Sequence, residues 1–78
     1  MPTVLVADGF RFFFFSNEGR EPPHVHVEKA DGVAKLWLSP PRFAYAEGLN
    51  PAEARRVLEL VATHEDDFLG RWHEHFGR

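Results

Sequence analysis

Residues 22–38 read PPHVHVEKADGVAKLWL, and this stretch decides the fold. Near its middle, Asp31-Gly32 lies between two runs of alternating residues. This arrangement predicts a β-hairpin, because the tight type I′ turn needs positive φ at both central positions. A two-residue loop at this point would place His26 opposite Trp37 in the neighbouring strand.

Alternation along these two strands predicts one apolar and one mixed face. The apolar face would carry Val25, Val27, Leu36 and Leu38, and the mixed face would carry His24, His26, Trp37 and a cross-strand pair of Glu28 with Lys35. The two histidines are two residues apart, so their side chains point the same way from Cα atoms about 6.6 Å apart. They can therefore act together.

A second Asp-Gly pair, Asp8-Gly9, predicts another hairpin upstream. Both of its faces are apolar, and the face shared with the histidines would carry Val4, Val6, Phe13 and Phe15. Downstream, Asn50-Pro51 followed by Glu53 is typical of a helix start.

Apolar residues then recur at helical spacing, and the stripe is Ala54, Val57, Leu58, Val61, Phe68, Trp72 and Phe76. Because residues 63–67 are polar, the pattern fits either one continuous helix or two helices. In the second case Thr63 and Asp66 could cap the second helix. We expect residues 1–78 to form one α+β domain. Its antiparallel sheet would consist of two hairpins, about four strands with room for a short fifth, and a C-terminal helix or helix pair would pack on one face.

The composition of the chain makes some classes of partner and some cellular locations less favourable than others. Nine basic and twelve acidic residues give a net charge of −3, which disfavours nucleic acid and leaves RNA as an open but weaker possibility. The sequence has no cysteine and no apolar run near the roughly 20 residues that span a bilayer, and we expect no export signal because Met1-Pro2-Thr3 carries no positive charge ahead of an apolar run. We expect a cytoplasmic protein with no membrane contact.

Two chemical hypotheses involve His24 and His26. A zinc-type site normally needs a third protein ligand, and none is evident because Glu28 lies further along the strand, so we expect no metal and no cofactor. Alternatively, the histidines divide the acid and base roles of a small metal-independent ribonuclease. The remaining histidines, His64, His73 and His75, are expected to be solvated.

The sheet face that carries the histidines suggests binding. If the helical tail covers only the other face, an apolar patch stays exposed, and such patches usually mark a contact surface. We predict that Phe13, Phe15, Trp37, Arg11 and Lys35 bind a partner there. Two helices, or a loop around Phe43 and Tyr45, would hide the patch instead.

Several stretches resemble the bacterial domain-of-unknown-function family 4160. They are residues 1–5, 12–19, 21–28 and 68–77, and the string Pro22-Pro23-His24-Val25-His26-Val27 is the specific one. The resemblance covers nearly the whole chain. It implies a small bacterial protein encoded beside another short protein and proposed as half of a toxin–antitoxin pair, and it transfers a possible role only to His24 and His26.

We therefore expect a small bacterial protein-binding module that contacts itself or a partner encoded nearby through its aromatic and histidine-bearing face. The competing expectation is the ribonuclease-type toxin that uses His24 and His26.

Overall fold

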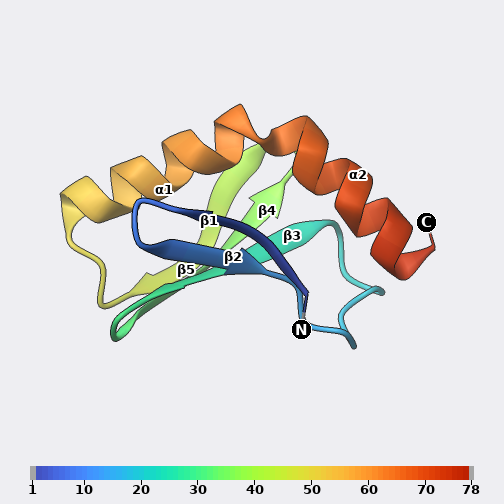
Figure 1. The fold of residues 1–78 in the computed structure, drawn as a ribbon, viewed down its shortest axis with the longest axis horizontal. Helices are drawn as coiled ribbons and strands as arrows, with labels where there is room; N and C mark the ends of the chain where they lie inside the picture. The colour runs from blue at the N-terminus through green and yellow to red at the C-terminus, as the bar shows by residue number, and fades with distance from the viewer. Residues whose placement is uncertain (1, 78) are drawn as a thin grey trace.

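The computed structural model describes residues 2–77 as a five-stranded antiparallel sheet followed by two helices (Figure 1). The strands are β1 (Thr3–Ala7), β2 (Phe10–Phe13), β3 (His24–Lys29), β4 (Gly32–Leu38) and β5 (Pro41–Glu47), and the helices are α1 (Pro51–Thr63) and α2 (Glu65–Phe76). Each strand pairs with the next one along the chain, so the sheet is a simple meander. The predicted α+β fold is confirmed, with a full fifth strand and a pair of helices.

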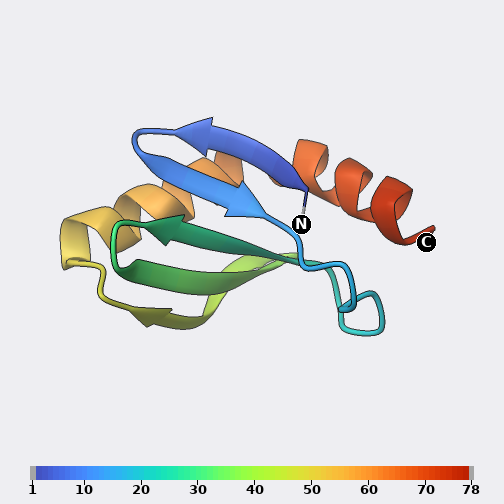
Figure 2. The same ribbon diagram turned by 60° about the horizontal axis from the view of Figure 1, so that its bottom comes forward.

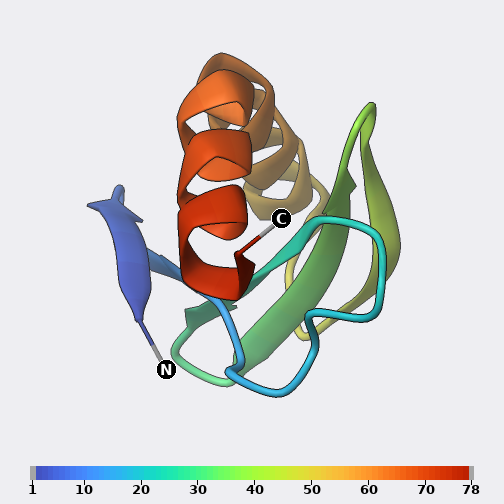
Figure 3. The same ribbon diagram turned by 90° about the vertical axis from the view of Figure 1, so that its right-hand side faces the viewer.

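Both helices lie across the same face of the sheet (Figures 1 and 3). The core lies between them and contains Phe10, Phe12, Phe14, Val25, Val27, Ala34, Leu36 and Leu38 from the strands and the loop that follows β2, with Val57, Leu60, Val61, Phe68 and Trp72 from the helices. Phe12 and Phe68 meet at its centre with ring centroids 5.7 Å apart. Within residues 2–77, neither helix is long and apolar enough to cross a lipid bilayer.

The first hairpin forms as predicted. Asp8 and Gly9 have φ values of 53° and 82°, and Ala7 pairs with Phe10 across this turn. Further along, the register shifts between Thr3 and Leu5, which is the sign of a β-bulge. Val4 therefore joins the core with 8% exposure, and its predicted place on the opposite face is wrong.

The second hairpin forms with a different register from the predicted one. The turn residues are Ala30 and Asp31, and Lys29 pairs with Gly32. His24 therefore lies opposite Trp37 and His26 opposite Lys35, two residues away from the predicted pairing. Because a shift of two residues preserves the alternation, the predicted faces are still correct.

Gly32 lies outside the turn and is the first residue of β4. A Cβ atom at this position would lie 2.5 Å from Leu49 Cδ2 and 2.8 Å from the Gly48 carbonyl oxygen, so glycine allows β4 to start close against the segment after β5. Ala30 takes the positive φ of the turn, at 50°. Glu28 faces Val33 rather than Lys35, and its carboxylate accepts a hydrogen bond from Arg11 Nη1 at 2.9 Å.

The start of α1 is the predicted one. Asn50 Oδ1 accepts a hydrogen bond from the Glu53 backbone N–H at 2.8 Å, and Glu53 Oε1 accepts one from the Asn50 N–H at 3.0 Å. This reciprocal pair satisfies two backbone donors that the helix leaves free. Within α1, Leu60 is buried and Leu58 is 36% exposed, so the predicted stripe is wrong at Leu58.

The two helices divide at His64, where the expected cap of Thr63 and Asp66 is absent. His64 Nδ1 donates to the Leu60 carbonyl oxygen at 2.9 Å, and its ring stacks on Phe68 with centroids 5.8 Å apart. His64 is also the residue before α2, which begins without a side-chain cap. The expectation that His64 is simply solvated is therefore wrong.

Replacing Phe12 tests the core. Phe12→Ala should lower the free energy of unfolding by about 3–5 kcal/mol, because it leaves a cavity between the sheet and α2. Urea denaturation measures the loss. The matched control is Val6→Ala in neighbouring β1, where the side chain is 68% exposed. We expect the control to change stability by less than about 1 kcal/mol; equal losses in both variants would contradict the described core.

Candidate functional site

Residues 14–23 connect β2 to β3 and turn around one end of the sheet (Figures 2 and 3). The loop approaches α2 closely, because a Cβ atom on Gly19 would lie 2.5 Å from a ring carbon of Phe76. On the other side, Glu21 Oε1 accepts a hydrogen bond from Lys35 Nζ of β4 at 2.6 Å. These contacts hold the loop over the first residues of β3.

The loop brings Glu18 to both histidines of β3. A single carboxylate oxygen, Glu18 Oε1, lies 2.7 Å from His24 Nε2 and 2.7 Å from His26 Nε2. The side chains of His24, His26 and Glu18 are 1%, 7% and 21% exposed, so Glu18 forms the most accessible edge of the group. We call Glu18, His24 and His26 the His–Glu–His cluster.

The contacts of His24 restrict how protons can be distributed in the cluster. His24 Nδ1 lies 2.9 Å from the carbonyl oxygen of Pro22, which can only accept, so Nδ1 must carry a proton. A neutral imidazole has one N–H, yet His24 Nε2 also lies 2.7 Å from a carboxyl oxygen. A second proton on His24, a proton on Glu18 or a metal ion is required at that contact.

Four aromatic rings enclose the histidines. Phe13 stacks on His26 at 5.7 Å between centroids, and Phe15 meets the same ring edge-on at 4.5 Å. Trp37 and Trp72 lie 5.6 Å and 4.8 Å from the His24 ring. The cluster is therefore surrounded by apolar groups, which strengthen electrostatic contacts inside it.

The five predicted binding residues surround the cluster but do not form an open apolar patch. Phe13 is 6% exposed, and Phe15 and Trp37 are half-buried. Arg11 lies over the Phe13 ring at 4.4 Å, and Lys35 lies over the Trp37 ring at 4.6 Å. The predicted exposed patch is thus wrong for Val4, which joins the core at the bulge, and for Phe13, whose ring packs against Phe15 and His26.

Protonation in the cluster depends on burial and on the shared contacts. Burial alone would raise the pKa of Glu18, but its hydrogen bonds and charge interactions with His24 and His26 together outweigh burial and bring the pKa below its ordinary value of 4.5. Burial lowers the pKa of His26 below its ordinary value of 6.5, and its contact with Glu18 offsets this only in part. Acid therefore opposes the folded arrangement at both groups.

The cluster could support two kinds of chemistry. Its three donor atoms, two imidazole nitrogens and one carboxylate oxygen, lie within 4.8 Å of one another, which is a ligand set suited to a divalent metal ion. The same carboxylate could orient a histidine for proton transfer. Burial of both histidines means that a large substrate reaches them only if the loop over them moves.

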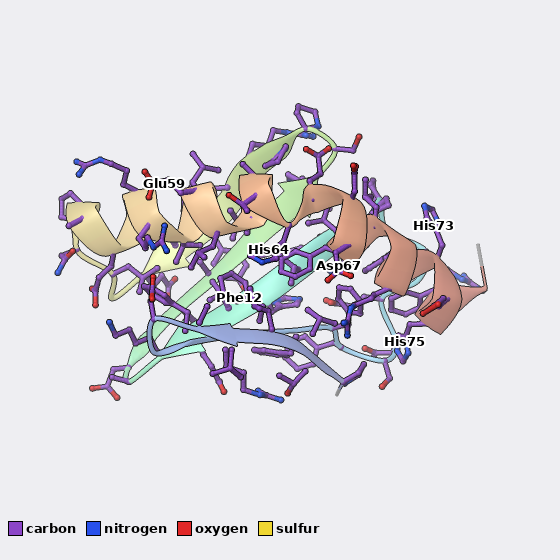
Figure 4. All side chains as sticks on the ribbon, turned by 45° about the horizontal axis from the view of Figure 1, so that its top comes forward. Phe12, Glu59, His64, Asp67, His73 and His75 are labelled. Atoms are coloured by element: carbon purple, nitrogen blue, oxygen red, sulfur yellow. The ribbon has the colours of Figure 1, made fainter. Side chains whose placement is uncertain are left out.

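The remaining candidates lie elsewhere. His73 and His75 are exposed and project from opposite sides of α2, as expected for helical residues two apart (Figure 4). Two surface hollows share Arg71 and Glu74 of α2 in their linings, and neither lining includes a residue of the cluster.

Glu18 is the site residue that the sequence analysis missed. It precedes His24 by six residues and lies in a loop, where strand alternation gives no information about direction. The available signal was the Glu18-Gly19 pair, because a glycine in such a loop can mark a close approach of the backbone to another element.

A comparison with protein families found a match over residues 9–73 to the domain of unknown function DUF4160. The chain belongs to the DUF4160 family. The matched region includes all three residues of the His–Glu–His cluster. Comparisons of this DUF4160 protein with curated proteins and with solved structures found no match.

The pKa shifts in this DUF4160 protein predict how stability depends on pH. In chelator-treated protein, the free energy of unfolding should fall as the pH drops through 6.5, where His26 of the unfolded chain takes up a proton. The free energy of unfolding should fall again below pH 4.5, because Glu18 takes up a proton at a higher pH in the unfolded chain than in the folded protein.

Urea denaturation at stepped pH measures this effect, and Glu18→Gln separates the two groups. The variant lacks the carboxyl that titrates below 4.5, so the stability difference between wild type and variant should shrink there. A difference that does not shrink below pH 4.5 would contradict the assignment; above that pH the difference also contains the effect of Glu18 on the pKa of His26.

Proposed function

We propose that this DUF4160 protein is a small protein-binding module that contacts its partner through the helix-free face of the sheet. The observation that carries this proposal is the set of apolar side chains on that face: Val6, Val33 and Tyr45 are 68%, 38% and 45% exposed. They come from β1, β4 and β5, so they extend across the sheet. In the strand register the Arg11–Glu28 pair lies between Val6 and Val33, so the face combines apolar and charged side chains, as protein–protein interfaces commonly do.

The charges on this face favour a protein partner over RNA. Arg11 donates to Glu28 at 2.9 Å, and Lys35 donates to Glu21 at 2.6 Å. Both cations are therefore already matched by carboxylates, whereas phosphate binding uses a surplus of positive charge. The net charge of −3 agrees with this argument.

The biological setting is part of the same proposal. We infer that the partner is the product of a neighbouring gene and that the two form a toxin–antitoxin-like pair in the bacterial cytoplasm, as the family resemblance implies. A second copy of the chain is the other partner that this face could accept.

The second candidate function is a metal-independent ribonuclease. It is favoured by the contact between Glu18 and His26, which supplies the orienting carboxylate that acid–base catalysis by histidine requires. If this hypothesis holds, purified protein cleaves RNA in the presence of a chelator, and Glu18→Gln reduces the rate. If the protein is a binding module only, neither the wild type nor Glu18→Gln cleaves RNA.

Co-expression with the neighbouring gene product tests the proposed function. We expect a complex that survives size-exclusion chromatography, and we expect Val33→Ser with Tyr45→Ser to weaken it by at least about tenfold in calorimetry. The matched control is Leu58→Ser, an exposed leucine on α1, which should leave affinity unchanged. A monomeric protein that binds neither its neighbour nor itself would contradict the proposal.

A further inference from the structure

We propose that Glu18, His24 and His26 form a binding site for a divalent transition-metal ion of the zinc type. The inference does not depend on the identity of the protein partner. It starts from the convergence of three donor atoms from two parts of the chain: both Nε2 atoms lie 2.7 Å from Glu18 Oε1, and the donor atoms of the group lie within 4.8 Å of one another.

These donor atoms are close to the positions that an ion requires. Zinc binds histidine nitrogen and carboxylate oxygen at about 2.0–2.2 Å, so tetrahedral ligands lie roughly 3.3 Å apart. A small outward movement of the Glu18 carboxylate would open that space. Glu18 lies in a loop and has a flexible side chain, whereas both histidines are held by β3. Three protein ligands leave a fourth position for water, as in other zinc sites with two histidines and one glutamate.

The hydrogen bond from His24 Nδ1 to Pro22 fits a metal ligand. In a neutral imidazole this bond places the one proton on Nδ1, so the Nε2 lone pair is then free to bind an ion on the side of Glu18. Histidines that bind metal usually donate their other ring N–H to a carbonyl or carboxylate in this way. The ion would also supply the positive charge that the contact between Nε2 and the carboxylate requires.

The surroundings of the cluster allow a cation. The basic residue that faces His26 across the strand register is Lys35. Its ammonium group is held by Glu21 at 2.6 Å and lies over the Trp37 ring at 4.6 Å. Two neutral histidines and one carboxylate give a site with one negative charge, and the aromatic rings around it shield the ion from solvent.

Protein purified without a histidine tag and treated with chelator provides the test. Calorimetric titration with Zn²⁺ should show one ion per chain, and Co²⁺ should give the visible absorption of a low-coordinate site with nitrogen ligands. Ion at a hundredfold excess over Kd should raise Tm by roughly 10–20 °C. Mg²⁺ and Ca²⁺ are the matched controls, and they should not compete because imidazole nitrogen is a poor ligand for hard cations.

Variants then locate the ion. Glu18→Gln should weaken Zn²⁺ binding by more than about tenfold, because even partners outside the ligand shell commonly contribute that much. The control carries His73→Gln and His75→Gln, which removes two exposed histidines and should bind Zn²⁺ as wild type does.

Three results would overturn the proposal. They are the absence of stoichiometric binding, a Co²⁺ spectrum unchanged from the free ion, and binding that survives Glu18→Gln but is lost in the control. If Glu18→Gln does not fold, the Co²⁺ spectrum of the His73→Gln, His75→Gln control decides the question: it should match that of the wild type, and its loss would overturn the proposal.

Discussion

One carboxylate oxygen, Glu18 Oε1, contacts the Nε2 atoms of both His24 and His26 at 2.7 Å, and the arrangement of this end of the sheet depends on it. The contact fastens the loop between β2 and β3 over the start of β3. The loop in turn lies against α2 through Gly19 and against β4 through Glu21. A negative oxygen shared by two buried rings is stable only with enough protons or a cation between them, so structure and ligand chemistry are linked at this point.

The strands and their faces could be predicted because alternation and Asp-Gly turns are local signals. Asp8-Gly9 forms the expected turn, and His24 and His26 share the expected face. The second register was wrong because the turn is Ala30-Asp31, and Gly32 instead begins β4 close to Gly48 and Leu49, a contact between segments that a hairpin pattern does not contain. The bulge between Thr3 and Leu5 was likewise missed, because strict alternation along the strand does not predict that Val4 joins the core.

The two histidines of the site, which lie in β3, could be predicted from the sequence, whereas Glu18, which lies in the loop before β3, could not. The Pro-Pro-His-Val-His-Val string places two histidines, but the direction of Glu18 is set by the path of a loop held between α2 and β4. This missing residue changes the chemistry, because it adds a third ligand to two histidines that the sequence alone left without one. It also changes the binding surface: with Phe13 covered, the exposed apolar residues of the helix-free face are Val6, Val33 and Tyr45.

Nitrogen-15 NMR of the histidine side chains tests most directly whether a proton or a metal ion balances the shared carboxylate. We predict that His24 keeps its Nδ1 proton with and without Zn²⁺, and that one equivalent of Zn²⁺ shifts the Nε2 resonances of His24 and His26 together. An unprotonated His24 Nδ1, or Zn²⁺-induced shifts confined to His73 and His75, would contradict it.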